Sequence, residues 1–249
     1  MGRVLSYLED RLSKGPVHLT LIDPDKSPGD KAGELAKGAV ELGSDAIMLG
    51  GSTGISRERM SQAARAVRRA VRVPSIIFPE GPGSLTPDAD AVFFMSLLNS
   101  RNLELVIRAQ ARAAPHVKAM GLEPIPLGYL VIAPGMRVGE VGDADVVPRE
   151  HPEIAVGYAL AAEYLGMRMV YLEAGSGAPS PVPEEMVRAV RSALGVPLIV
   201  GGGIRTAADA RRLLSAGAQA LVTGTVTEEE GLGEGFQGIV GEVKRSRGR

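Results

Sequence analysis

Two glycine-rich segments are the first candidates for a binding site. They read GGG at residues 201–203 and TGT at residues 223–225. Glycine lets backbone N–H groups come close to an anion, and a helix N-terminus adds a favourable dipole. The first segment leads into a helix whose start, Thr206-x-x-Asp209, is similar to a capping box. We therefore predict that the two segments form one phosphate cradle, with tight turns as the alternative role of the glycines.

A third segment, YLEAGSG at residues 171–177, combines an acid with a flexible polar turn. Glu173 follows an apolar run and can serve as a general base, or as an acceptor for a substrate hydroxyl. Ser176 lies between two glycines and adds a hydroxyl and further N–H donors. The alternative is that Glu173 is a carboxylate at the rim of the barrel, paired with an arginine. We favour the role as a base or as an acceptor for the substrate hydroxyl.

Oxygen ligands suitable for a divalent cation lie in a fourth segment, DPDK at residues 23–26. Mg²⁺ takes one or two protein oxygens together with substrate phosphates, and Asp23 fits that preference. Ser52, which follows another apolar run, can add a hydroxyl. The alternative for Asp23 is a loop or cap residue. For Asp25 that structural role is the better interpretation.

Composition excludes several classes of protein. The 249 residues include no cysteine, which rules out disulfides, a thiolate nucleophile and Cys-ligated metal centres. The 28 Lys and Arg residues nearly balance the 29 Asp and Glu residues, which argues against nucleic-acid binding by bulk charge. No apolar run approaches the roughly 18 residues of a membrane span. The absence of cysteine also fits a cytoplasmic location. Three histidines show no ligand spacing and are expected to be structural or solvated: His18, His116 and His151.

Eight short apolar runs predict buried strands. Most are continuously apolar, as is typical of strands covered on both faces. They occupy residues 17–23, 45–51, 75–80, 91–98, 125–132, 168–175, 197–203 and 220–225. Each candidate segment above lies at or just after the end of such a run. In a parallel barrel those ends meet at the face where ligands bind.

Helical patterns separate most of these runs. We expect helices over residues 31–42, 57–71, 103–114, 153–165, 183–194 and 206–216, the third of them ending before Pro115. Alternation of strand and helix predicts right-handed βαβ units and a parallel sheet. Eight strands in a chain of this length predict a (β/α)₈ TIM barrel that forms a single domain over residues 1–249. An open, doubly wound sheet is the alternative.

Two segments depart from a regular barrel. Residues 81–90, GPGSLTPDAD, hold two glycines and two prolines, so the third outer helix is expected to be missing. A long ligand could lie in that gap, or a neighbouring loop or subunit could cover it. Residues 133–152 form a long loop, which is a feature that is usually functional or mobile.

The motifs together resemble the geranylgeranylglyceryl phosphate synthase family. They follow one another at strand ends over nearly the whole chain: LTLIDPDK (19–26), LGGS (49–52), YLEAGSG (171–177), GGGIR (201–205) and TGT (223–225). Leu21 stands where the bacterial heptaprenylglyceryl phosphate synthases have a lysine, two residues before the first aspartate. The chain therefore resembles the larger group of archaeal enzymes.

The resemblance implies a modified TIM barrel whose third helix is replaced by a non-helical segment. It also implies an Mg²⁺-dependent prenyltransferase that joins the C3 hydroxyl of sn-glycerol 1-phosphate to geranylgeranyl diphosphate. Asp23 and Ser52 would hold Mg²⁺. The sn-glycerol 1-phosphate would be held by Tyr171, Leu172, Glu173, Ala174, Gly175, Ser176, Gly177, Gly202, Gly203, Gly224 and Thr225. Family members form dimers or hexamers, so a homo-oligomer is expected.

For this chemistry we expect Glu173 to orient the attacking hydroxyl and take its proton. A divalent metal would neutralise the charge that develops on the leaving diphosphate. The apolar tail needs a channel, which we expect to run from the ends of the first two strands toward residues 79–85 and the strand that carries Phe93 and Phe94. The alternatives are another phosphate-binding barrel enzyme, such as a sugar-phosphate isomerase, and a non-catalytic phosphate-binding barrel.

Overall fold

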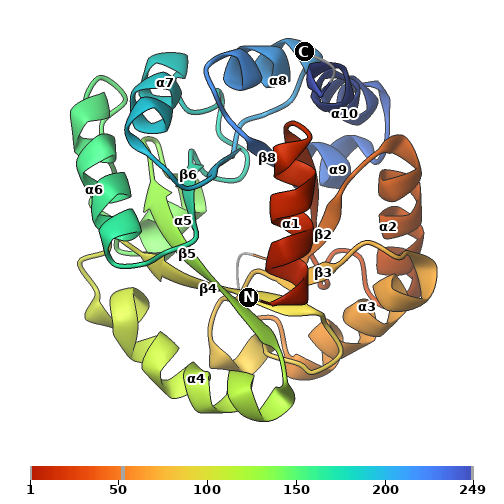
Figure 1. Cartoon of the computed structure of the whole chain (residues 1–249). Coiled ribbons are helices and arrows are strands. Elements are labelled where there is room, and N and C mark those ends of the chain that lie inside the picture. The colour runs from red at the N-terminus through yellow and green to blue at the C-terminus, as the bar shows by residue number, and fades with distance from the viewer. Residues whose placement is uncertain (1, 52–53, 248–249) are drawn as a thin grey trace.

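The protein is a closed barrel of eight parallel strands in a computed structural model, which describes residues 2–51 and 54–247. Each strand pairs with its neighbours along the chain, and the first pairs with the last (Figure 1). The strands are β1 (Val17–Ile22), β2 (Ala46–Leu49), β3 (Ser75–Ile77), β4 (Ala91–Leu97), β5 (Glu123–Val131), β6 (Met169–Glu173), β7 (Leu198–Gly201) and β8 (Ala220–Thr223). This confirms the predicted TIM barrel and excludes the open sheet.

Helices form an outer ring around the barrel (Figure 1). The ring consists of α2 (Asp30–Leu42), α3 (Arg57–Ala70), α4 (Ala109–Met120), α6 (Pro152–Tyr164), α7 (Glu184–Ala193), α8 (Ala207–Ser215) and α10 (Glu234–Ser246). Two short helices follow β5 and β8, namely α5 (Met136–Val141) and α9 (Thr225–Glu230). Helix α1 (Arg3–Ser13) lies across one end of the barrel, where Val4, Leu5 and Leu8 pack with the interior side chains. In the described part of the chain, no helix has the length and apolar character needed to cross a membrane.

The ring lacks an α-helix between β3 and β4. Residues 81–90, all of which the structure describes, contain only one 3-10 turn (η1, Pro82–Ser84), as their glycine and proline content predicts. An apolar cleft of about 80 Å³ lies beside this turn. Leu85, Phe93 and Phe94 are among its lining residues.

The helix predicted over residues 103–114 differs from the observed one. A π-helical turn (η2, Glu104–Arg108) precedes α4, and α4 continues through Pro115 to Met120. The predicted end before Pro115 is therefore wrong. Pro115 lacks the N–H group that would bond the carbonyl of Ala111. Both residues are exposed, so water can satisfy that carbonyl and the helix is not broken.

Strand side chains alternate between two apolar cores. On β6, Met169 and Tyr171 face the barrel interior, whereas Val170 and Leu172 pack against the surrounding helices. The register between β5 and β6 places Tyr129 beside Tyr171. Both tyrosines therefore lie inside the barrel, close to the C-terminal ends of their strands.

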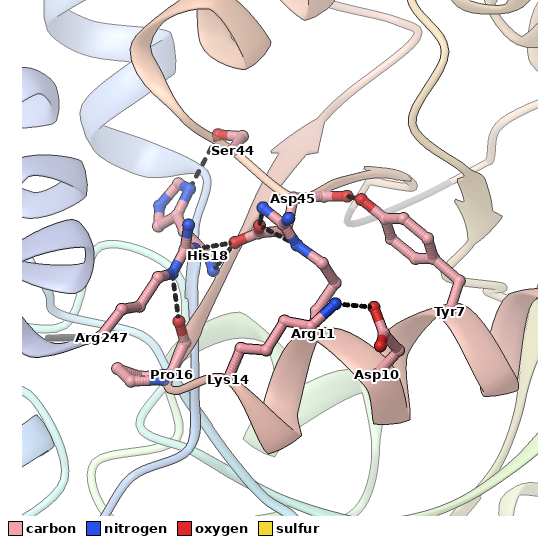
Figure 2. Close-up of polar contacts among 9 residues, drawn as sticks. All are labelled: Tyr7, Asp10, Arg11, Lys14, Pro16, His18, Ser44, Asp45 and Arg247. Carbon is pink, nitrogen blue, oxygen red and sulfur yellow. Dashed lines mark hydrogen bonds and ion pairs between the residues drawn. The ribbon is translucent and has the colours of Figure 1, made fainter.

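A buried ionic network joins distant segments at the other end of the strands (Figure 2). Asp45 precedes β2, and its side chain is fully buried. Its carboxylate pairs with Arg11 of α1 and with Arg247, which follows α10. It also accepts a hydrogen bond from the backbone N–H of His18 on β1 at 2.9 Å. One carboxylate thus fixes both terminal helices to the barrel.

The ring of His18 extends this network and confirms that the residue is structural. It lies within hydrogen-bond distance of the Ser44 hydroxyl at 2.8 Å and the Thr223 hydroxyl at 3.0 Å. Burial lowers the pKa of His18 to about 3, so the ring is neutral at physiological pH.

Asp45→Ala should lower the free energy of unfolding by about 2 kcal/mol or more, because it leaves two arginines facing each other without their anion. Asp10→Ala is the matched control. It removes the exposed ion pair between Asp10 of α1 and Lys14, which directly follows α1 (Figure 2), and should cost less than about 1 kcal/mol. Urea denaturation measures both changes. Equal losses in the two variants would contradict the role assigned to Asp45.

Candidate active site

The C-terminal ends of the strands open into a single cavity of about 420 Å³. Residues in or directly after all eight strands line it. Most of the residues predicted to bind ligands lie on its wall: Asp23, Tyr171, Glu173, Ser176, Gly177, Gly202, Gly203, Gly224 and Thr225. The fold therefore brings together segments that are up to about 200 residues apart in the sequence, as expected of a barrel.

Glu173 is a buried carboxylate held by three donors. Its Oε1 accepts a hydrogen bond from the backbone N–H of Gly175 at 2.6 Å. The hydroxyls of Tyr171 and Tyr129 also donate to this carboxylate. Burial raises the pKa of Glu173, and the three hydrogen bonds oppose that rise. A carboxylate with a raised pKa on a cavity wall is a typical candidate for proton transfer.

The two tyrosines remain protonated and act as donors. Burial raises the pKa of both Tyr129 and Tyr171 well above 10, and the charge of Glu173 adds to the rise. Their rings pack edge to face with centroids 5.1 Å apart. The ring of Phe78 packs on Tyr129 at 5.4 Å. The carboxylate therefore lies above an aromatic floor inside the barrel.

The predicted phosphate segments meet at one place on the wall. The hydroxyls of Ser176 and Thr225 are 3.0 Å apart, and the N–H of Gly177 donates to the Thr225 hydroxyl at 3.1 Å. These contacts join the turn after β6 to the start of α9. Hydroxyl groups and backbone N–H groups thus gather on the wall of the cavity that Gly203 also lines, as an anion site requires.

The glycines after β7 are required for both conformation and space. Gly202 and Gly203 have φ angles of +79° and +69°, a region that L side chains rarely adopt. A Cβ on Gly202 would collide with Glu173 Oε1 and lie 2.6 Å from the nitrogen of Gly175. A Cβ on Gly203 would lie 2.6 Å from the backbone of Ser180. The close approach of these turns is therefore part of how Glu173 is held.

Three of the predicted ligand-binding residues do not present side chains to the cavity. Leu172 and Ala174 belong to the core between the strands and the helices, so only their backbone could contact a ligand. Gly175 contributes its N–H group to Glu173.

The predicted metal ligand Asp23 follows β1 and is buried at the cavity wall. Its Oδ1 accepts a hydrogen bond from the N–H of Asp25 at 2.9 Å. A Cβ on Gly51 would lie 2.7 Å from the Asp23 carboxylate, so a glycine there makes room for it. Asp25 itself pairs with Arg59 at 2.6 Å, which agrees with a structural role. The other predicted metal ligand, Ser52, lies outside the described residues.

Sequence reasoning missed a second carboxylate near Asp23. Glu80 lines both the main cavity and the apolar cleft. Its Oε2 accepts a hydrogen bond from the N–H of Ile55 at 3.4 Å. Burial raises the pKa of Glu80, and the negative charges of Asp23 and Asp25 raise it further. The position of Glu80 at the end of the third apolar run, the same signal that identified Glu173, could have revealed it.

Tyr129 is the other residue that was missed. Tyr129 lies in the fifth apolar run and points into the barrel opposite Tyr171. Predicting that position requires the register between β5 and β6, which a single sequence does not give. Over residues 2–51 and 54–247, no group of three or more His, Cys, Asp or Glu side chains could hold a metal ion by itself.

Gly202→Ala should lower the free energy of unfolding by about 1–3 kcal/mol, because the new methyl group meets Glu173 at a positive φ angle. Gly241→Ala is the control. Gly241 lies inside α10, where a Cβ would meet only the end of the flexible Arg245 side chain at 3.4 Å, so alanine should stabilise the protein by about 0.5–1 kcal/mol. Thermal unfolding measures both. If Gly202→Ala were as stable as the wild type, the turn after β7 could accommodate a Cβ beside Glu173, which would contradict the role assigned to Gly202.

Comparisons with known proteins agree with this geometry. The model of the PcrB family matches residues 8–243. Geranylgeranylglyceryl phosphate synthase from Pyrococcus horikoshii is 52% identical over 229 residues, which is 92% of this chain and 90% of that protein. The enzyme of the same name from Methanothermobacter marburgensis is 54% identical over 226 residues, covering 91% and 92% of the two chains.

A solved structure is similarly close. It is the crystal structure of (S)-3-O-geranylgeranylglyceryl phosphate synthase from Thermoplasma acidophilum, in complex with its substrate sn-glycerol-1-phosphate. It superposes with a TM-score of 0.94 at 46% identity and covers 98% of this chain and 100% of that one. With this fold, these motifs at the strand ends and a family match over nearly its whole length, the chain belongs to the PcrB family.

Proposed function

We propose that this protein forms the ether bond between the C3 hydroxyl of sn-glycerol 1-phosphate and geranylgeranyl diphosphate. One observation carries the proposal. The main cavity, which holds the candidate anion site, shares lining residues with the apolar cleft, so that site adjoins a space for a long apolar chain. The shared residues are Pro79, Glu80, Met95, Leu97 and Leu105. The relatives named above, and the complex of one of them with sn-glycerol-1-phosphate, support the same assignment.

The phosphate of the acceptor would bind where Ser176, Gly177 and Thr225 meet. Backbone N–H groups and hydroxyls there suit phosphate oxygens. Gly203 and Gly224 line the same region of the cavity and allow the ligand to approach the backbone. Fixing the phosphate in this way would hold the three-carbon glycerol chain against Glu173 and lower the entropic barrier to attack.

Glu173 would accept the proton of the C3 hydroxyl. As the hydroxyl oxygen forms its bond to C1 of the prenyl chain, the bond from C1 to the diphosphate oxygen breaks and the diphosphate leaves with that electron pair. The hydroxyls of Tyr129 and Tyr171 would keep the carboxylate oriented toward the acceptor. The faces of Phe78 and the tyrosines would favour the partial positive charge that develops on the allylic carbon.

The residues around Asp23 fit an Mg²⁺ ion that is bound together with diphosphate. Asp23 offers carboxylate oxygens, Gly51 leaves space beside them, and Glu80 lies on the same cavity wall. When bound, Mg²⁺ would supply neutralisation of the charge on the leaving diphosphate. Ser52 remains a second proposed ligand on the strength of the sequence motif alone.

The apolar cleft argues against the rival functions. A sugar-phosphate isomerase would use the phosphate cradle but would have no use for a cleft lined by Leu85, Phe93 and Phe94. A non-catalytic phosphate-binding barrel would not need a buried carboxylate with three donors. Incubation with sn-glycerol 1-phosphate and prenyl diphosphates of graded length tests the function directly. Failure to convert any of them would refute it.

We also propose that the protein is a homo-oligomer, a dimer or a hexamer, and that it works in the cytoplasm. The outer face of α6 supports assembly because it carries an apolar stripe at helical spacing. Ile154, Tyr164 and Leu165 are 40%, 81% and 76% exposed, and Gly157 and Ala161 lie between them. Light scattering decides between the two sizes. The lack of cysteine is consistent with the cytoplasmic location.

Glu173→Gln should reduce turnover by about 100-fold or more, because an amide cannot accept the proton. The KM for sn-glycerol 1-phosphate should change much less, since the phosphate contacts remain. In the wild type, turnover should fall as the pH drops through the raised pKa of Glu173, because protonation removes the base. The variant should lack that acidic limb. A near-normal rate in Glu173→Gln would remove the carboxylate from the reaction.

Asp23→Asn should lower Mg²⁺-dependent turnover by about 100-fold and raise the Mg²⁺ concentration needed for half-maximal rate. Asp25→Asn is the control. Asp25 lies two residues after Asp23 in the same loop, and its carboxylate pairs with Arg59. It should change the rate only slightly. Steady-state rates over a range of Mg²⁺ concentrations make the comparison. If the wild-type enzyme stayed active in the presence of EDTA, the proposed dependence of the reaction on a divalent metal would be wrong.

A further inference from the structure

The π-helical turn η2 lies between the two cavities. Leu105, the second residue of this turn, lines both the main cavity and the apolar cleft. A π turn contains one residue more than an α turn, which rotates the side chains before it by about 100° relative to those after it. The direction in which Leu105 points therefore depends on the π turn being kept.

Two side chains fasten this turn to β4. The Nε2 of Gln110, on α4, donates to the carbonyl oxygens of Met95 at 2.6 Å and of Leu105 at 2.9 Å. The hydroxyl of Ser96, on β4, donates to the carbonyl oxygen of Val106 at 2.7 Å. Carbonyl groups in a π turn accept from the N–H five residues ahead instead of four, as Glu104 does from Ala109. The two side chains add hydrogen bonds to the carbonyls of Leu105 and Val106 in the same turn.

The amide of Gln110 is held in one orientation at a cost. Both of its N–H groups face carbonyl oxygens, and turning the amide over would bring its own oxygen against them. In the present orientation Oε1 is buried and has no hydrogen-bond partner among the described residues. A buried acceptor without a partner destabilises the folded state. A leucine or methionine at this position would avoid that cost, since the residue lines an apolar cleft.

We propose that Gln110 is a positioning residue for prenyl chain length. It holds the π turn against β4, so that Leu105 stays fixed as a partial wall where the main cavity passes into the cleft. The wall restricts how much of an apolar chain can continue toward Phe93 and Phe94. This inference rests on the proposed prenyltransferase function. Selectivity for chain length would then depend on the hydrogen bonds that Gln110 donates to Met95 and Leu105, as well as on the bulk of the lining side chains.

The test compares Gln110→Met with Gln237→Met. Methionine keeps the length of glutamine but cannot donate to either carbonyl. Gln237 is a matched control because its Nε2 also donates to a carbonyl five residues earlier, that of Leu232 at 2.9 Å, at an exposed site on α10 away from both cavities. Prenyl diphosphates from C10 to C30 compete in one reaction, and the products are separated by chain length.

In Gln110→Met, the ratio of kcat/KM for the preferred chain length to that for the next longer one should fall by about tenfold. The KM for sn-glycerol 1-phosphate should stay within about twofold, because its site lies elsewhere on the wall. Gln237→Met should keep the wild-type ratio. A purely structural role for Gln110 would lower the melting temperature but leave the ratio unchanged, and that result would overturn the proposal.

Ser96→Ala provides an independent reading, because it removes the second fastening of the same turn and only one small group. If Gln110→Met does not fold, a reduced ratio in Ser96→Ala supports the proposal and an unchanged ratio refutes it. A wild-type protein that converts no prenyl diphosphate would instead refute the proposed function. The two failures are therefore distinguishable.

Discussion

The burial of one carboxylate is the constraint on which the site depends. Glu173 ends a strand inside an apolar barrel, where an unpaired charge would be very costly. The cost is met by two tyrosine hydroxyls and one backbone N–H, which come from β5, from β6 and from the turn after β6. Each of these donors is itself fixed by the barrel. The geometry of the site is therefore a consequence of how the strands align.

The same constraint explains the glycines around the site. The turn after β7 must pass close to Glu173 and to Gly175, and only a residue without a Cβ can do so at Gly202. Gly201 is required in the same way beside the hydroxyl of Tyr171. These glycines make room for the carboxylate and its donors as well as for an anion. At the opposite end of the strands, the buried Asp45 joins both terminal helices to the barrel.

The sequence was informative where local composition alone decides structure. Continuous apolar runs predicted the eight strands, and the glycine and proline content of residues 81–90 predicted the missing helix. It was insufficient where the outcome depends on packing. The contact between Tyr129 and Glu173 requires the register of two strands. The continuation of α4 through Pro115 requires that the freed carbonyl be exposed. Glu80 lies at the end of an apolar run, as Glu173 does, so its position at the cavity was predictable from the sequence.

The missing third helix raises the question of why the barrel wall does not collapse there. Polar contacts from α3 hold the replacing segment in place: the hydroxyls of Ser61 and Thr86 are 3.0 Å apart, and Arg65 pairs with Asp88 at 2.9 Å. Ser61 also donates to Asp88, which lowers the pKa of that carboxyl. Leu85 is buried from the same segment and closes part of the gap. Because a hydrogen-bonded loop covers less area than a helix, an apolar cleft persists beside β4 in an otherwise closed fold. The barrel thus gains a lateral space for a long ligand by losing one element, without opening its sheet.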